Sequence, residues 1–290
     1  LGSWSNNCYK KMELKSYAKI NLGLHVHDRR KDGFHNLTTV FQEISLYDNV
    51  NIREAKAFSC KTNLSSINEK ENFGTIAYKL LKEKFPDIPN VEISISKNIP
   101  INAGLGGGSS NGAAVVKGIN SLFNLSLTNK EMLEISSRVS SDSSFFINGG
   151  LQLGTQRGEV LKKISKTVIP EHVLLVKPKL KVKTKEAFLD LKNHLLNEDT
   201  HINLSQLLEE LKNNNFNSKL FKNDFEMYVF KTHPEIGDIK LKILDLGAIY
   251  ASLSGTGSTV FGIFPTEVAA QKAEAFFSPH YSTYYVNPII

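Results

Sequence analysis

The segment from residue 100 to residue 110 has the composition of a loop that binds phosphate. It reads Pro100-Ile101-Asn102-Ala103-Gly104-Leu105-Gly106-Gly107-Gly108-Ser109-Ser110. Glycines at four of five consecutive positions free the backbone to adopt positive φ angles and to approach a ligand closely. Successive N–H groups of such a loop form a concavity that binds anions, and a helix that starts there adds its positive end. The two serines supply hydroxyl groups for capping that helix or for contacting a phosphate or a magnesium ion.

The spacing of these glycines excludes two common phosphate-binding loops. A Walker A loop needs a lysine directly after its last glycine, and none follows Gly108. A dinucleotide-binding loop needs its third glycine three positions after the second, and this spacing is not met. A flexible linker or a tight turn is the alternative, but a linker is rarely framed by a patterned strand and a periodic helix. We therefore predict a phosphate site of another class.

Patterned segments surround the loop and are expected to position it. Residues 14–27 alternate between apolar and polar side chains, which predicts a half-buried strand. Apolar residues from Ala113 to Phe123 share one helical face, so a helix is expected to follow the loop. Thr128 and Glu131 form a capping box for a further helix. The other elements expected in this half are strands over 37–46, 49–53 and 91–95 and a helix over 72–84.

The second half of the chain mixes strands and helices in the same way. A looser pattern near 158–170 indicates a boundary, so we expect one domain over 12–160 and another over 161–290, with residues 1–11 as an extension ahead of Met12. Because the regular βαβ alternation of a doubly wound sheet is not seen, the predicted fold class is α+β. The elements expected here are a strand over 173–176, helices over 184–195, 203–213 and 234–246, strands over 248–253 and 258–264, and a helix after Pro265.

Composition limits the class of function. No stretch approaches about 18 apolar residues, so no membrane-spanning helix is expected, and the amino-terminal residues lack the apolar segment of a secretory signal. The two cysteines, Cys8 and Cys60, have no local cluster of Cys or His that would bind zinc, and they fit a reducing compartment. The net charge of +6 allows an acidic partner, but no run of Lys and Arg interleaved with aromatic residues indicates nucleic acid. A cytoplasmic location is expected, or the plastid stroma in an organism with plastids.

Four segments of the chain resemble the GHMP kinase superfamily. Residues 104–111 and 253–257 resemble its second and third motifs, and residues 16–22 and 32–35 resemble the branch that phosphorylates a cytidylyl sugar alcohol in non-mevalonate isoprenoid synthesis. The resemblance extends from Lys15 to about Pro265. It implies an amino-terminal nucleotide domain like ribosomal protein S5 and a carboxyl-terminal ferredoxin-like α/β sandwich domain. It also implies ATP as co-substrate, Mg²⁺ with the nucleotide, small-molecule substrates, and a monomer or weak homodimer.

The resemblance assigns the catalytic pair to Lys19 and Asp142. A carboxylate within hydrogen-bonding distance of an alcohol can accept its proton as the alcohol attacks a phosphoryl group. An ammonium group beside it keeps the carboxylate ionised and offsets charge on the transferred group. Without the resemblance, Lys19 would be interpreted as a solvated strand residue and Asp142 as a loop cap.

The remaining site residues follow from chemistry together with the resemblance. The ring of Phe34 can stack on a pyrimidine, and His35 can both donate to and accept from the Watson–Crick edge of cytosine. Phe188 would cover the other face of the base, although core packing of its helix is the alternative. Further positions assigned by the resemblance are Asn21, Phe41 and Thr184 for the acceptor and Asn72 and Lys97 for the nucleotide base or ribose. The third motif contributes Ser254, Gly255, Thr256 and Gly257, although this segment could equally be a tight hairpin.

The chain departs from the superfamily pattern at a few positions without losing a functional group. They are Asn102, Gly112, Ser140, Ser141 and Ser144, and they affect the fine geometry of loops. Another kinase of the superfamily, for homoserine or mevalonate, is an alternative, but those acceptors have no base to stack on Phe34. A nucleotide-binding sensor without catalysis is a second alternative, against which the retained Lys19 and Asp142 argue.

Overall fold

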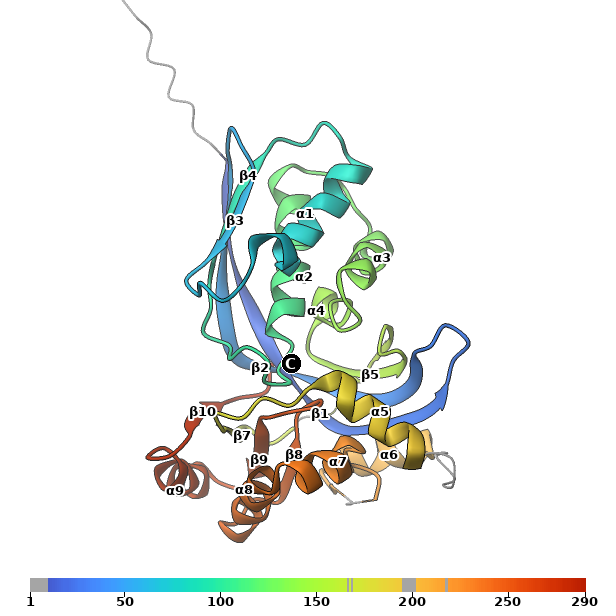
Figure 1. Ribbon diagram of the computed structural model, residues 1–290, viewed down its shortest axis with the longest axis vertical. Helices are drawn as coiled ribbons and strands as arrows, with labels where there is room; N and C mark the ends of the chain where they lie inside the picture. The colour runs from blue at the N-terminus through green and yellow to red at the C-terminus, as the bar shows by residue number, and fades with distance from the viewer. Residues whose placement is uncertain (1–9, 166, 168, 195–201, 217–218) are drawn as a thin grey trace, which may run out of the picture. The chain divides into compact units, whose positions relative to one another are not determined.

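The computed structural model describes residues 10–165, 167, 169–194, 202–216 and 219–290 (Figure 1). Most of the predicted extension, with Cys8, therefore lies outside the described residues. The described chain forms two compact units, each assembled from separate segments. Unit 1 contains the residues up to Ser16 with Tyr47–Asn98 and Gly107–Ile147, and unit 2 contains Tyr17–Leu46, Ile99–Gly106 and Asn148–Ile290. This division differs from a single cut at residue 160, which stays a prediction.

Two long strands, β1 (Lys11–Arg29) and β2 (His35–Glu54), run through both units. They pair with each other, and a turn at residues 31–33 joins them. Residues 37–46 and 49–53, which we predicted as separate strands, are one continuous strand in β2. Residues 47–48 keep the extended backbone, so the two predicted segments are joined without a break.

Unit 1 is a sheet with helices packed on one face. The second part of β2 pairs antiparallel with β4 (Val91–Ser96), and β3 (Ser59–Thr62) pairs parallel with β4. Helices α1 (Phe73–Lys84), α2 (Gly107–Leu122) and α3 (Asn129–Val139) lie over these strands (Figure 1). A Cβ at Gly118 would lie 2.6 Å from Ile52 Cδ1, so α2 packs directly on the sheet. The capping box of Thr128 and Glu131 at the start of α3 is confirmed.

Unit 2 packs one layer of strands against a second sheet, which helices cover on its other side. The first part of β2 pairs with β5 (Leu151–Gln156), and β5 pairs with β6 (Val160–Lys163). The second sheet has the order β10–β7–β9–β8, and all of its pairs are antiparallel. These strands are β7 (His172–Lys177), β8 (Tyr250–Leu253), β9 (Val260–Phe264) and β10 (Ser282–Val286).

The two faces of β7 explain why its residues form a continuous apolar run. Val173 and Leu175 join a core with residues of β1, β2 and β5, whereas Leu174 and Val176 join a core with the helices. Strands buried on both faces need apolar side chains at every position. The helices of unit 2 are α5 (Thr184–His194), α6 (Leu204–Lys212), α7 (Phe225–Thr232), α8 (Pro234–Asp245) and α9 (Glu267–Phe277).

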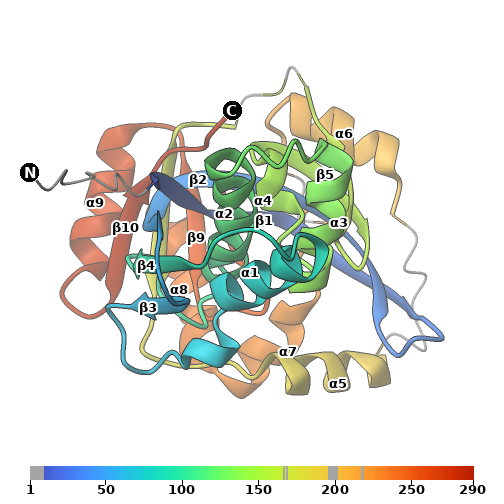
Figure 2. The ribbon, with the colours of Figure 1, turned by 90° about the horizontal axis from the view of Figure 1, so that it is seen from above.

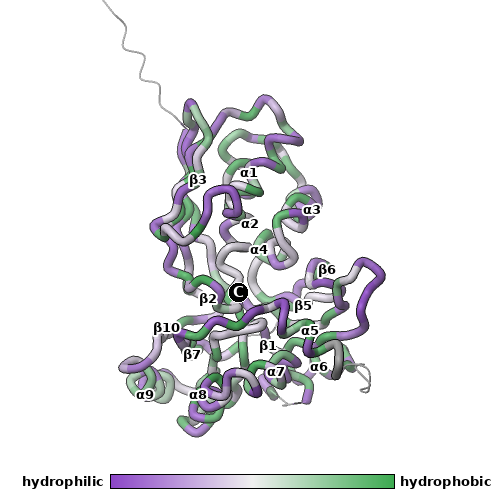
Figure 3. The backbone as a smooth tube through the Cα atoms, viewed as in Figure 1, coloured by the Kyte–Doolittle hydropathy of each residue, from purple (hydrophilic) through white to green (hydrophobic). Residues whose placement is uncertain are grey.

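The helices of unit 2 show the amphipathic pattern expected for one buried face. Ile236, Ile239 and Ile243 of α8 are buried, and hydrophilic and hydrophobic residues alternate along its tube (Figure 3). Helix α9 lies beside β10 (Figures 1 and 2). The predicted α+β class is therefore confirmed, with mixed helices and strands in both units. Among the described helices, none is both long and apolar enough to cross a membrane.

Candidate active site

The glycine-rich loop of unit 2 is packed against the third motif. Gly104 has a φ of +77°, and a Cβ there would lie 1.8 Å from the carbonyl oxygen of Ser254. Ser254 Oγ donates to the carbonyl oxygen of Gly104 over 3.0 Å, and the amide of Thr259 donates to that of Ala103 over 3.3 Å. Only glycine combines this backbone angle with so close an approach. The third motif therefore lies beside the loop within unit 2.

Two departures from the superfamily pattern have local explanations. Asn102 has a φ of +53°, a conformation that asparagine tolerates better than most residues with a side chain. A Cβ at Gly112 would lie 2.7 Å from Val139 Cγ1 and 3.3 Å from Phe73 Cβ. Glycine at this position thus lets α2 approach both α1 and α3 closely.

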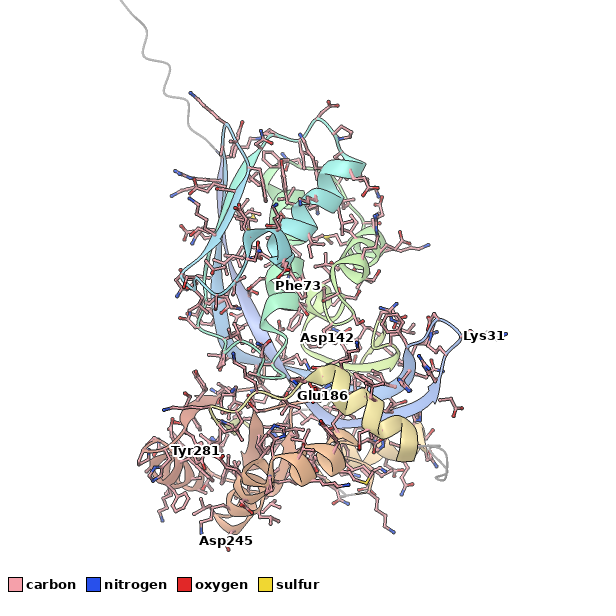
Figure 4. The ribbon with its side chains drawn as sticks, viewed as in Figure 1. Lys31, Phe73, Asp142, Glu186, Asp245 and Tyr281 are labelled. Carbon is pink, nitrogen blue, oxygen red and sulfur yellow. The ribbon has the colours of Figure 1, made fainter. Side chains whose placement is uncertain are left out.

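Helix α2 begins at Gly107 and presents Ser109 and Ser110 in its first turn. The segment that carries Asp142, which is labelled in Figure 4, is hydrogen-bonded to this turn within unit 1. Ser140 Oγ donates to Ser109 Oγ over 2.9 Å, and Ser143 Oγ donates to the carbonyl oxygen of Ser109 over 3.1 Å. Two further departures therefore have contrasting roles: Ser140 takes part in this contact, and Ser144 Oγ bonds instead to the carbonyl oxygen of Leu133. Nothing described here explains Ser141.

Lys19 lies on β1 in unit 2 and is almost fully buried. Its backbone amide donates to the carbonyl oxygen of Leu105 over 3.0 Å, which joins the strand to the glycine-rich loop. Its ammonium group donates to Asn21 Oδ1 over 2.7 Å and lies 5.5 Å from the centre of the Phe41 ring. Asn21 Nδ2 donates in turn to Thr39 Oγ1 over 2.9 Å. Lys19, Asn21 and Phe41, which we predicted separately, therefore form one cluster.

The third motif borders this cluster. A Cβ at Gly255 would lie 3.6 Å from the ammonium nitrogen of Lys19. Thr256 Oγ1 shares a hydrogen bond of 3.0 Å with Thr184 Oγ1 at the start of α5. The motif thus contacts Thr184, which we predicted for the acceptor, and lies next to Lys19, which we predicted as catalytic.

The aromatic residues predicted for the base are arranged in two stacks. The rings of His35 and Phe188 lie nearly parallel, with centroids 5.7 Å apart and an interplanar angle of 19°. Phe188 also meets Phe225 edge to face at 4.8 Å. Phe34 is 50% exposed, and the guanidinium carbon of Arg157 lies 3.9 Å from its ring centre. The contact of Arg157 with Phe34 was not predicted, because a single arginine in a turn forms no motif that indicates its partner.

Asn72 and Lys97 of unit 1 have internal partners that the sequence did not predict. Asn72 caps α1, because its Oδ1 accepts from the amide of Gly74 over 2.8 Å. The ammonium group of Lys97 forms a buried ion pair with Asp48 and donates to Asn111 Oδ1 over 3.0 Å. Asp48 was missed because it stands in no motif, and Asn111, the last residue of the glycine-rich motif, was given no role of its own.

The predicted catalytic pair is divided between the two units. Lys19 in unit 2 is bonded to the loop at Leu105, and the segment of Asp142 in unit 1 is bonded to the helix at Ser109. The described residues include no group of three or more His, Cys, Asp or Glu side chains that could hold a metal ion. Oxygen donors of the kind that Mg²⁺ accepts are present in the Ser109 and Ser110 hydroxyls.

Comparison with known proteins indicates the same superfamily as the sequence motifs. The family model for the GHMP kinases N terminal domain matches residues 72–150, and that for GHMP kinases C terminal matches residues 195–282. A 4-diphosphocytidyl-2-C-methyl-D-erythritol kinase of Alkaliphilus oremlandii is 38% identical over 285 residues, which covers 96% of each chain. The enzyme of that name from Acetivibrio thermocellus is 38% identical over 264 residues, covering 89% of this chain and 92% of its own.

Solved structures agree with these relatives. A crystal structure of 4-(cytidine 5'-diphospho)-2C-methyl-D-erythritol kinase superposes with a TM-score of 0.81 at 26% identity, covering 96% of this chain and 99% of that chain. Homoserine kinase from Cytophaga hutchinsonii has a TM-score of 0.71 at 21% identity, covering 99% and 96%, and shares the fold. The chain therefore belongs to the GHMP kinases and, within them, to the 4-diphosphocytidyl-2-C-methyl-D-erythritol kinase family.

Proposed function

We propose that the protein transfers the γ-phosphate of ATP to the 2-hydroxyl of 4-diphosphocytidyl-2-C-methyl-D-erythritol, giving the 2-phosphate and ADP, in the non-mevalonate route to isopentenyl diphosphate. One observation carries this proposal. The glycine-rich segment is bonded at Leu105 to the strand of Lys19 and at Ser109 to the segment of Asp142. The residues proposed for binding the nucleotide and for the reaction therefore share direct contacts within each unit. The proposed setting is the cytoplasm, with small molecules as partners.

The triphosphate is proposed to lie along residues 100–110. Backbone N–H groups at the positive-φ glycines and the amino-terminal end of α2 supply the anion site. Mg²⁺, which typically keeps water ligands and binds substrate phosphates, would be held with the nucleotide near Ser109 and Ser110. It would supply charge neutralisation for the β- and γ-phosphates.

The reaction itself needs a proton acceptor and a cation. In the proposed step the 2-hydroxyl oxygen bonds to the γ-phosphorus, the bond from that phosphorus to the ADP oxygen breaks, and Asp142 accepts the hydroxyl proton. Lys19 offsets the charge of the transferred phosphoryl group. Because Asn21 receives a hydrogen bond from the Lys19 ammonium and is itself bonded to Thr39, the cation is held in one orientation.

The cytosine is proposed to stack on the ring of Phe34, with His35 at its hydrogen-bonding edge. Arg157 supports one face of the Phe34 ring, and the ring is half exposed. Phe188 stacks on the imidazole of His35 and would fix its plane. The role that we predicted for Phe188, covering the other face of the base, stays a prediction.

An assay of ADP release tests the proposed function. Purified protein with ATP and Mg²⁺ is expected to release ADP when the cytidylyl acceptor is added, and very slowly with 2-C-methylerythritol phosphate, homoserine or mevalonate. The slow rates follow because binding energy from the remote base positions the reacting hydroxyl. Efficient ADP release with an acceptor that lacks cytidine would overturn the assignment.

A further inference from the structure

A chain of buried polar side chains in unit 1 leads from an ion pair to a serine of the glycine-rich segment. Its members are Asp48, Lys97, Asn111, Ser16 and Ser110, and each is at most 9% exposed. Polar groups at this depth are stable only when their donors and acceptors are matched. The direction of each hydrogen bond can therefore be followed from one end of the chain to the other.

The ion pair determines the orientation of the Asn111 amide. The ammonium group of Lys97 contacts Asp48 Oδ2 and donates to Asn111 Oδ1 over 3.0 Å, while Asn111 Nδ2 donates to Asp48 Oδ2 over 2.9 Å. The opposite orientation would place the amide oxygen against the carboxylate and the amide N–H groups against the ammonium. Two unmatched buried contacts of that kind are unfavourable, and more so because the partners are charged.

The amide in turn determines the direction of two hydroxyl groups. Asn111 Nδ2 donates its second proton to Ser16 Oγ over 2.9 Å, so Ser16 is an acceptor there. Ser16 Oγ donates its own proton to Ser110 Oγ over 2.7 Å. Ser110 is thus an acceptor in this chain of bonds, and its own proton is directed elsewhere.

We propose that Ser16 and Asn111 are positioning residues, which hold the Ser110 hydroxyl as a donor to a phosphate oxygen of bound ATP. The inference rests on the proposed function, because it needs the nucleotide at the start of α2. Ser110 lies in the first turn of that helix, where N–H groups favour an anion. A hydroxyl that already accepts from Ser16 donates to the phosphate without an orientational search, which favours binding by preorganisation. Lys97 and Asp48 then act through Asn111.

A double-mutant cycle on ATP affinity tests this positioning role. Ser110→Ala removes the donor and is expected to raise the Kd of a non-hydrolysable ATP analogue about tenfold, the range of a hydrogen bond to a charged group. Ser16→Ala leaves that hydroxyl but frees its direction, so a rise of about threefold is expected. Because Ser16 acts through Ser110, Ser16→Ala should have no further effect in the Ser110→Ala protein. The KM for the acceptor should stay unchanged in all three variants.

Ser136→Ala is the matched control. Ser136 is a fully buried serine of α3 in the same unit, and its hydroxyl has no hydrogen-bond partner among the described residues. This substitution should leave the Kd of the ATP analogue unchanged. The inference would be overturned if Ser16→Ala raised the Kd of the ATP analogue by the same factor in the unmodified protein and in the Ser110→Ala protein. It would also be overturned if Ser110→Ala left that Kd unchanged. Neither result would contradict the proposed function. Failure of the unmodified protein to bind the ATP analogue would overturn both.

Discussion

Two buried lysines, one in each unit, illustrate how neighbours decide the role of the same residue type. Lys97 of unit 1 is paired with the carboxylate of Asp48 and bonded to Asn111. Within unit 2, Lys19 donates to the neutral amide of Asn21 and lies over the Phe41 ring. An ammonium neutralised inside its own unit stabilises that unit and orients polar neighbours. An amide orients an ammonium group without neutralising its charge, and the role proposed for Lys19 at a phosphoryl group requires such a charge.

The same contrast extends to the surroundings of each lysine. Unit 1 positions its serines through hydrogen bonds whose direction follows from a buried ion pair. Unit 2 positions its residues for the acceptor through amides and aromatic rings, such as the stack of His35 and Phe188. Substitutions in the ion-pair network of unit 1 should therefore affect stability and nucleotide affinity, and substitutions among these amides and rings of unit 2 should affect turnover and acceptor affinity.

The largest effect is expected from Lys19→Met. Removing the cation should lower kcat by at least about 100-fold, the usual scale for groups that stabilise charge or transfer protons in the transition state. Steady-state kinetics with the cytidylyl acceptor measures this change. Asp142→Asn should lower kcat by a similar factor while both substrates bind within severalfold of the unmodified protein. A kcat near that of the unmodified protein in either variant would remove that residue from the reaction.

Lys97→Met is the matched substitution in unit 1, and its main effect should be on stability. It leaves the carboxylate of Asp48, whose side chain is fully buried, without its ammonium partner. Breaking a buried ion pair in this way lowers the free energy of unfolding by about 3–5 kcal/mol. Urea denaturation monitored by circular dichroism measures the loss. The double variant Asp48→Leu with Lys97→Met should regain part of it, whereas equal losses in Lys19→Met and Lys97→Met would contradict the distinction between the lysines.

Phe34→Ala and His35→Ala should each raise the KM for the cytidylyl acceptor roughly tenfold, with little change for ATP. A stacked base contributes on the order of 1–3 kcal/mol, and an unmade hydrogen bond in a closed site costs about as much. Phe276→Ala is a suitable control, since this phenylalanine of α9 is 51% exposed, compared with 50% for Phe34. An equal rise in KM for the acceptor without cytidine would show that these residues do not recognise the base.

The smallest effect concerns His25, a buried histidine of β1 in unit 2. Burial lowers the pKa of His25 below its ordinary value of 6.5, although a bond to the carbonyl oxygen of Leu220 and the charge of Asp224 act in the opposite direction. The unfolded chain therefore binds this proton more tightly than the folded one, and the contribution to stability falls as the pH drops through about 6.5. Thermal unfolding of His25→Gln should show a slightly smaller decrease in Tm between pH 7.5 and pH 5.5, by roughly one or two degrees. A steeper decrease would reverse the assigned sign.

The sequence by itself determined the features that depend on residues adjacent to one another in the chain. The glycines of residues 104–108 predicted a backbone for anion binding, and the capping box at Thr128 and the 3.6-residue periodicities located most helices. Short elements such as β3, β6 and α4 (Phe145–Asn148) were missed because they hold too few residues to show a period. Strand β10 and helix α7 were also missed, since both depend on packing against β7 and α8 for their stability.

Only the tertiary structure decided which distant side chains meet. Ser16 bonds to Ser110 across 94 positions of the chain, and Lys97 pairs with Asp48 across 49 positions. Nothing local selects these partners, because a buried charge must find its counter-charge wherever the topology of the strands brings one. For the same reason, the residues adjacent to Arg157 in the chain did not predict that it lies on the ring of Phe34. Residue types and spacing thus predicted the chemistry of the site, whereas long-range pairing assigned each buried side chain its partner.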